Sequence, residues 1–347
     1  MRIAVDAMGG DFAPAAIMEG LALALNELDW IDQLVVVGHQ EKLALYFDKL
    51  RIAANPKIRK VHATEVVEMS DLSTVVLRTK RDSSMTVCAK LMRDGEVDAI
   101  VSAGHTGAAV ASTKVLARTL PGIDRPAIAA IMPAAQGHFV LVDAGANTEC
   151  HPINLAQFAI MGEAYYKLAF GIDNARIGLL SVGGEDVKGN DLTKEAFKIL
   201  SGMPINFVGN VEGNTIFEGA ADVVICDGFI GNVLLKGCEG LARSVMHWMK
   251  DAFGKDPIRK TGAMLAKNAF RDLKAIGDSD SYGGAPLLGI NGVCIIGHGA
   301  SSPKAVYNAI RVAGESVKYG MNDLIIRRID ECGLNLEKKN HPAAAAL

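Results

Sequence analysis

The sequence predicts an α/β protein with a mainly parallel sheet covered by helices, and three observations predict it. Short apolar runs, such as 34–38 and 223–226, recur along the chain and are typical of buried strands. Segments of helical composition alternate with these runs. Most of the runs end in a loop rich in Gly, Asn, Asp or Ser, as the carboxyl ends of parallel strands often do.

The elements follow from this pattern in order. Pro14 fits the first turn of the first helix because its missing N–H is not needed there. Strands are expected at 2–6, 34–38, 58–62, 97–101, 128–132, 139–142, 177–182, 206–209, 223–226 and 293–296. Helices are expected at 14–28, 41–50, after 69–71, and at 83–92, 108–116, 152–170, 190–200, from 233, at 258–276 and from 303. We expect 1–320 to form one α/β unit, or two lobes around a central crevice, and 321–347 a helix and a disordered tail.

Composition excludes several classes of protein. With 347 residues the chain is long enough to bury a large core, and no apolar run reaches the roughly 20 residues of a membrane span. The amino terminus is strand-like and resembles no secretory signal, so a cytoplasmic location is expected. A net charge of −3 gives no reason to expect nucleic acid as a partner. The six cysteines are scattered, so we expect reduced thiols and no metal site.

Two loops with the same layout predict the functional site. After the strand at 97–101, the loop Ser102-Ala103-Gly104-His105-Thr106-Gly107 leads into a helix, and after 223–226 the loop Asp227-Gly228-Phe229-Ile230-Gly231-Asn232 does the same. Unpaired N–H groups at such a helix start favour an anion, although plain tight turns use the same residues. Because both loops follow strands of one sheet, we expect them to flank a single crevice.

The common catalytic motifs are absent. The chain has no phosphate-binding P-loop, no dinucleotide fingerprint and no nucleophile elbow. The remaining candidates are polar residues of the strand-end loops. Lys188 is either the cation for a phosphate or oxyanion or an ordinary solvated lysine, and His105 is either a donor to the anion or leaving group or a packed or capping residue. Asp6 and Asp227 either orient neighbours or cap helices, and Asn210 and Asn232 either bind or form turns.

These loops together resemble a known family. The segments are Asp6-Ala7-Met8-Gly9-Gly10-Asp11, Val101-Ser102-Ala103-Gly104, Lys188-Gly189-Asn190, Asn210-Val211-Glu212-Gly213 and Cys226-Asp227-Gly228-Phe229. From Met1 to about Lys318 the chain is similar to PlsX, the bacterial acyl-acyl-carrier-protein:phosphate acyltransferases. His105 stands where that family generally has Asn, so a role specific to an imidazole is not general to it.

The resemblance implies a fold, a reaction and partners. The fold is that of isopropylmalate dehydrogenase and phosphotransacetylase, in a homodimer that needs no cofactor. The reaction transfers a fatty acyl group from acyl carrier protein to inorganic phosphate, and the acyl phosphate passes to a membrane glycerol-3-phosphate acyltransferase for phospholipid synthesis. From the loops and the resemblance together, we expect the catalytic residues to be Lys188, Asn232, Asp227 and His105, the phosphate-binding residues to be Ser102, Gly104, Thr106, Gly107, Gly228 and Gly231, and further site residues to be Asp6, Gly9, Gly10, Asn190 and Asn210, with His105 and Gly231 assigned from the loops alone.

Residues 258–276 predict an amphipathic helix. Its apolar stripe comprises Ile258, Leu265, Ala269, Leu273 and Ile276, and its basic face Lys260, Lys267, Arg271 and Lys274. The stripe packs against the core or a second copy, or else the segment lies on a membrane surface or receives the acidic carrier protein. If the segment lies on a membrane surface, the protein is peripherally membrane-associated.

Three rival functions remain at this point. A short-chain phosphotransacetylase would use coenzyme A in place of a carrier protein. A nicotinamide-linked dehydrogenase on the same fold would need the dinucleotide fingerprint that the chain lacks. A non-catalytic scaffold between acyl carrier protein and the membrane would not need polar loops such as those with Lys188 and Asn232.

Overall fold

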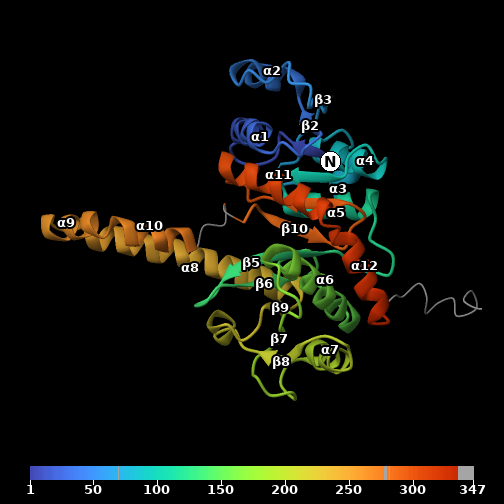
Figure 1. Cartoon of the computed structure of the whole chain (residues 1–347), viewed down its shortest axis with the longest axis vertical. Helices are drawn as coiled ribbons and strands as arrows, with labels where there is room; N and C mark the ends of the chain where they lie inside the picture. The colour runs from blue at the N-terminus through green and yellow to red at the C-terminus, as the bar shows by residue number, and fades with distance from the viewer. Residues whose placement is uncertain (69, 277–279, 281, 335–347) are drawn as a thin grey trace, which may run out of the picture.

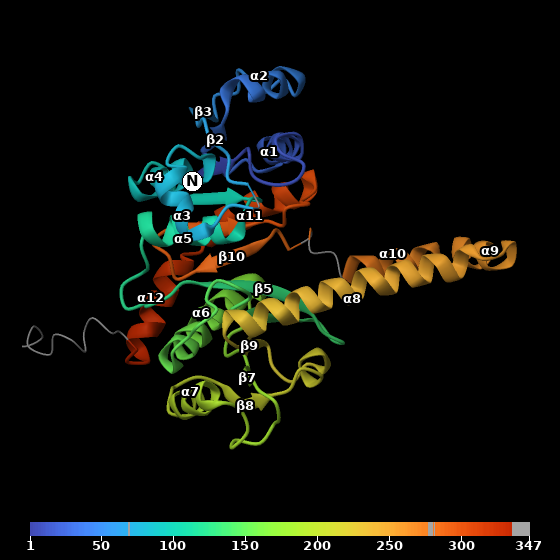
Figure 2. The same cartoon turned by 180° about the vertical axis from the view of Figure 1, so that it is seen from behind.

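One sheet of 11 strands runs through the chain, in the order β3-β2-β1-β4-β11-β10-β5-β6-β9-β7-β8. The structure is a computed structural model that describes residues 1–68, 70–276, 280 and 282–334. Helices cover both faces of the sheet, and a helical arm projects sideways from its middle (Figures 1 and 2). The helix-covered, mainly parallel sheet predicted from the sequence is confirmed.

The expected strands and helices are found, most within a few residues of their predicted ends. The strands are β1 (Arg2–Asp6), β2 (Gln33–Gly38), β3 (Ile58–His62), β4 (Ala99–Ser102), β5 (Ala127–Pro133), β6 (His138–Val142), β7 (Ile177–Leu180), β8 (Phe207–Val211), β9 (Val223–Ile225), β10 (Ala285–Leu288) and β11 (Val293–Ile296). The helices are α1 (Ala15–Glu27), α2 (Gln40–Lys49), α3 (Ser73–Thr79), α4 (Ser84–Arg93), α5 (Thr106–Leu116), α6 (Pro152–Phe170), α7 (Asp191–Ser201), the 3-10 helix η1 (Thr215–Glu218), α8 (Gly228–Gly254), α9 (Pro257–Leu265), α10 (Lys267–Ile276), α11 (Pro303–Lys318) and α12 (Met321–Glu331). Met69 and the expected disordered tail at 335–347 lie outside the described residues.

The sheet reverses direction in its middle. β11, β10, β5 and β6 pair successively in antiparallel fashion, whereas the strands on either side of them pair in parallel. Three reversals leave β9 running opposite to β4. The sequence analysis did not predict β10, whose four residues include Pro286, a residue that is rare in central strands.

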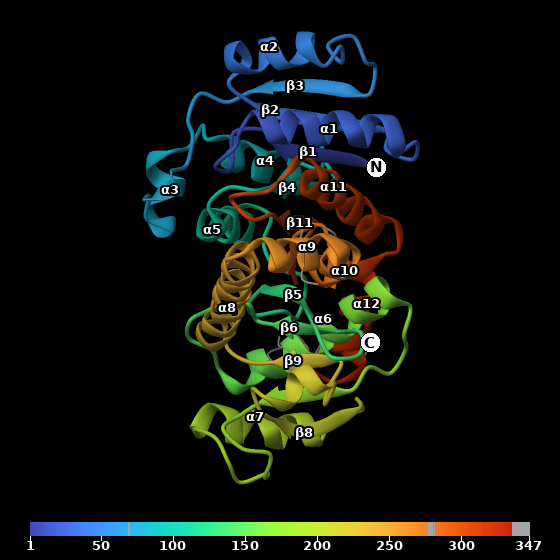
Figure 3. The same cartoon turned by 90° about the vertical axis from the view of Figure 1, so that its left-hand side faces the viewer.

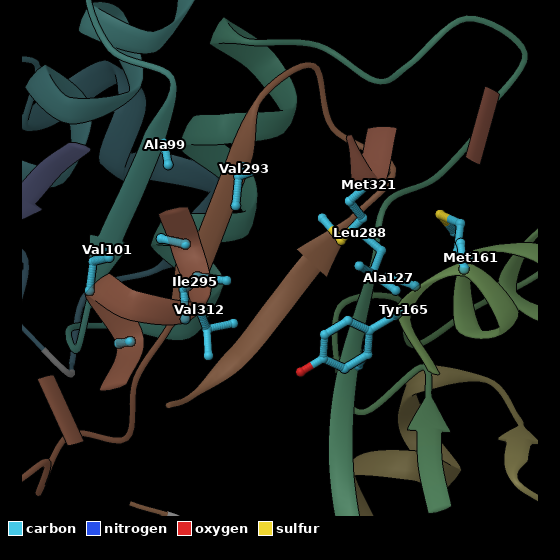
Figure 4. Packing of buried hydrophobic residues seen from close by; sticks show 14 of the residues in the cluster. Ala99, Val101, Ala127, Met161, Tyr165, Leu288, Val293, Ile295, Val312 and Met321 are labelled. Atoms are coloured by element: carbon cyan, nitrogen blue, oxygen red, sulfur yellow. The ribbon is translucent and has the colours of Figure 1, made fainter. Parts of the chain in front are cut away.

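Each strand contributes alternate residues to the two faces of the sheet. In β1, Ile3 and Val5 join one buried core while Ala4 joins the other, and β6 divides its residues in the same way. Figure 4 shows the first core where β4, β11, β10 and β5 meet the helices α6, α11 and α12, with Leu288 and Tyr165 packed at its centre. This core spans the reversal and therefore fixes the two halves of the sheet relative to each other.

The arm is a helical hairpin and corrects one prediction. The single helix expected at 258–276 is two helices, because α9 ends with Ala266 as its C-cap and α10 then runs back alongside α8 (Figure 2). The fold-back brings Phe270 of α10 onto Phe253 of α8, with ring centroids 5.1 Å apart. One continuous apolar stripe along 258–276 therefore does not exist.

The apolar side chains of the arm are not packed in the core. Ile258 is 85% exposed, Leu265 80% and Leu273 56%. The side chains of Lys274 and Ile276 lie outside the described part of the chain. The prediction that these side chains pack in the core of their own chain is therefore wrong for Ile258, Leu265 and Leu273. A second copy of the chain, a carrier protein or a membrane surface are the contacts that the sequence analysis leaves for them. No helix among the described residues is long and apolar enough to span a membrane.

Candidate active site

The first group of predicted residues gathers at the carboxyl ends of β1 and β4. The Ser102 hydroxyl donates to Oδ2 of Asp6 at 2.7 Å, and the backbone N–H of Gly104 donates to that hydroxyl oxygen at 3.2 Å. Burial raises the pKa of Asp6, although hydrogen bonds from Ser84 and Ser102 oppose the shift. A Cβ on Gly9 would lie 2.8 Å from the nitrogen of Gly104, so only glycine permits this approach.

His105 begins α5 and is its N-cap. Its Nδ1 accepts from the backbone N–H of Ala108 at 3.2 Å, so a neutral imidazole carries its proton on Nε2, as a donor. Thr106 and Gly107 form the first turn of α5. Gly10, with φ +108°, lies close to Gly299, which brings the loop after β11 to the same place. The first group thus combines loops from three neighbouring parallel strands.

The second group surrounds the start of α8, and the helix begins earlier than predicted. Asp227 is its N-cap, because Oδ1 of Asp227 accepts from the N–H of Ile230 at 2.9 Å. The capping carboxylate draws Gly228, Gly231 and Asn232 into the start of α8, which the sequence assigned to a loop. Gly231 packs so closely on the loop after β6 that a Cβ there would lie 1.9 Å from the carbonyl oxygen of Asp143.

Asp143 organises that loop, and sequence reasoning assigned it no role. Its carboxylate accepts five hydrogen bonds from four residues, which are Ile128, Gly145, Ala146 and Asn147. Gly145, with φ +137°, faces the side chain of Asn232. The available signal was a polar segment directly after an apolar strand, the same pattern that identified the other loops.

The loop between β7 and α7 holds the predicted cation. Asn190 is the N-cap of α7 and accepts from the N–H of Thr193 at 2.9 Å. Nδ2 of Asn210 donates to the carbonyl oxygen of Glu185 at 2.8 Å and so holds the loop against β8. Lys188 is exposed, and within the described part of the chain its ammonium makes no ion pair. It is therefore available to an anion from solvent.

The two groups do not meet in the way the sequence predicted. The expectation of a shared crevice assumed that both loops lie at one edge of a parallel sheet, but β4 and β9 run in opposite directions with four strands between them. No hydrogen bond joins the groups in the described ranges. In Figures 1 and 3, α5 lies above the first part of α8. These two helices follow β4 and β9, which belong to different halves of the sheet.

A pocket of about 190 Å³ lies within the second group. Residues of β7, of the loop before α7, of α7 and of the first turn of α8 form its walls. Asn190 and Asp227 both line it, so two helices begin at its edge. Cys226 also lines the pocket, and burial raises the pKa of its thiol well above its usual range. The six cysteines are free thiols, as predicted.

Solved structures define the class of fold. A phosphotransacetylase from Streptococcus pyogenes superposes with a TM-score of 0.62 at 18% identity, covering 92% of this chain and 94% of that one. A branched-chain phosphotransacylase from Enterococcus faecalis superposes with a TM-score of 0.55 at 14% identity, covering 91% of this chain and 99% of that one. The fold is therefore that of an α/β phosphotransacylase, as expected from the resemblance.

Sequence comparison then shows the family. The family model described as "Fatty acid synthesis protein" matches residues 1–324. A relative from Pelotomaculum thermopropionicum named phosphate acyltransferase is 48% identical over 318 residues, which cover 92% of each chain. A second from Desulfitobacterium hafniense, with the same name, is 44% identical over 330 residues, 95% of this chain and 98% of that one. The chain belongs to this fatty acid synthesis protein family, so the resemblance to PlsX is confirmed.

Proposed function

We propose that the protein transfers a fatty acyl group from the thioester of acyl carrier protein to inorganic phosphate, giving acyl phosphate for phospholipid synthesis. One observation carries the proposal: relatives named phosphate acyltransferase match more than nine-tenths of the chain at 44–48% identity. The segments that resemble PlsX in sequence are also the loops that form the two polar groups.

The proposed reaction needs no acylated residue. An oxygen of phosphate attacks the thioester carbonyl, the C–S bond breaks as the C–O bond is completed, and the carrier thiolate takes a proton. The two thiols nearest the start of α8 support this route. Burial raises the pKa of Cys150 to about 11 and that of Cys226 well above its usual range, so neither is a thiolate nucleophile at neutral pH.

In this proposal, positioning and electrostatics supply the rate. Holding two reactants together is worth roughly 7–11 kcal/mol, and one oxyanion donor about 3 kcal/mol. Lys188 has the free ammonium that a phosphate or oxyanion requires. Asn232 presents an amide near the start of α8, where the helix dipole favours negative charge. His105 belongs to the first group and has a donor at Nε2. It can contact the phosphate or oxyanion held by Lys188 and Asn232 only if the substrate spans both groups.

Thiol release from palmitoyl-acyl carrier protein tests this function. Release should depend strictly on added inorganic phosphate, and Asn232→Ala should lower turnover at saturating concentrations of both substrates. Release at the same rate without phosphate would contradict the proposal. Equal turnover of acetyl-coenzyme A under the same conditions would favour a short-chain phosphotransacetylase, the second candidate, whose fold the chain shares.

We further propose that the arm contacts a membrane surface and a second copy of the chain. Leu265 of α9 is 80% exposed, and an apolar cavity of about 610 Å³ lies between α8, α9 and α10. Lys260 of α9 lines this cavity, and Lys267 and Arg271 on α10 add positive charge that suits anionic lipid. Such an association places a cytoplasmic enzyme where a membrane acyltransferase uses its product.

Vesicle flotation tests the membrane contact. Wild-type protein should float with anionic vesicles, Leu265→Glu should not, and Leu45→Glu should behave as wild type, because Leu45 is 70% exposed on α2 of the body. Light scattering of the same proteins without vesicles reports their mass in solution. A wild-type protein that never floats overturns the membrane proposal, and a monomeric mass overturns the dimer.

A further inference from the structure

One hydroxyl in the pocket between α7 and α8 has no partner. Four polar side chains line this pocket, and three have hydrogen bonds within the protein: Asn190 caps α7, Thr193 donates to Asn190, and Asp227 caps α8. The fourth is Ser181, whose Oγ is buried and bonds to nothing in the described ranges. A buried hydroxyl without a partner costs about 1–3 kcal/mol, so its position calls for a ligand.

The surrounding backbone fixes this hydroxyl in place. The N–H of Ser181 donates to the carbonyl oxygen of Val211 at 2.9 Å, which holds the end of β7 against β8. Gly189 closes over it with φ +112°, and a Cβ there would lie 2.1 Å from Oγ1 of Thr193 and 3.1 Å from Oγ of Ser181. Only glycine lets the loop that carries Lys188 approach so closely.

The walls of the pocket favour a neutral ligand over an anion. Leu180, Val182, Cys226 and Ile230 supply mostly apolar surface, and Val182 and Ile230 are exposed at the mouth. The only charged side chain in the lining is the carboxylate of Asp227, which opposes a phosphate dianion inside the pocket. Apolar walls with a single placed donor suit a neutral group that has one hydrogen-bond acceptor.

We propose that this pocket receives the thioester end of the acyl donor, and that the partly buried Ser181 side chain turns about its Cα–Cβ bond so that its hydroxyl donates to the thioester carbonyl oxygen. The inference rests on the proposed acyl transfer and adds to it a substrate-contacting residue. When phosphate attacks, the carbonyl oxygen becomes an oxyanion, and the same hydrogen bond strengthens. Phosphate approaches from outside the pocket, on the side of the exposed Lys188.

Steady-state kinetics of Ser181→Ala, on the full chain with palmitoyl-acyl carrier protein and inorganic phosphate, test this assignment. We expect kcat to fall about 100- to 1000-fold, as for other single oxyanion donors. The KM for phosphate should stay within about twofold, and Tm should not fall, because the hydroxyl has no protein partner to lose. Ser316→Ala is the matched control: its hydroxyl in α11 is also buried without a partner, away from this pocket, and kcat should be unchanged.

Two results would overturn the assignment. One is a Ser181→Ala variant with wild-type kcat, and the other is a variant in which only the KM for phosphate rises. If the wild type releases no thiol with phosphate, the proposed function itself fails. Calorimetric binding of palmitoyl-pantetheine then tests independently whether the pocket binds the thioester through Ser181. Ser181→Ala should then bind this thioester about 2- to 12-fold more weakly, the value of one neutral hydrogen bond, and equal affinity would exclude the contact.

Discussion

Replacing Asp143 by Asn should destabilise the protein far more than its small size change implies. Oδ1 accepts from the N–H groups of Ile128, Gly145 and Ala146 at 2.9–3.0 Å. Oδ2 accepts from the backbone N–H and Nδ2 of Asn147 at 2.8 and 2.9 Å. An asparagine amide keeps the first three bonds but turns its NH₂ toward the two donors of Asn147. Two buried donors then lack an acceptor, at about 1–3 kcal/mol each, or about 2–6 kcal/mol together.

Thermal unfolding measures this loss. With an unfolding entropy of about 2.1 cal/mol/K per residue, a chain of 347 residues should lose about 3–8 °C in Tm. Asp173→Asn is the control, because Asp173 is a surface residue paired with Lys167, and such pairs are worth less than about 1 kcal/mol. The reasoning is refuted if Asp143→Asn lowers Tm no more than Asp173→Asn does.

Three further predictions follow from the site and its surroundings. Lys188→Ala should lower turnover at saturating substrate about 100- to 1000-fold, whereas the exposed Lys194→Ala on α7 should not; equal turnover would remove Lys188 from the site. Gly231→Ala should lower Tm by about 1–4 °C, since its Cβ meets backbone at 1.9 Å; an unchanged melting curve would show that α8 shifts freely. The hydroxyl and N–H of Thr64 hold the pKa of Asp82 below its usual range, so that stabilisation exists above about pH 3.9 and is lost as pH falls through the folded-state pKa. Thr64→Val should therefore lower Tm at pH 7 more than at pH 3, and an equal loss at both would contradict it.

The sequence predicted which loops are polar better than how those loops are arranged. Ser102 with Asp6, and Asn232 with its neighbouring glycines, were singled out because small polar residues directly after an apolar run fit a binding loop as well as a tight turn. Asp143 has the same local pattern, yet its role depends on donors from another strand at Ile128, which no local pattern records. Ser181 was hidden inside a predicted strand, since its missing partner is a property of three-dimensional packing.

By itself, the sequence determined the alternation of strands and helices, the family, and which loops are polar, because each of these depends on residues adjacent along the chain. The tertiary structure decided the reversal of the sheet at β10, and with it the separation of two loops that a purely parallel sheet would have placed at one edge. It also decided that 258–276 folds back on α8, since the contact of Phe270 with Phe253 joins residues from different helices. Strand pairing and helix packing are set by contacts between distant residues, and periodicity along one segment carries no information about them.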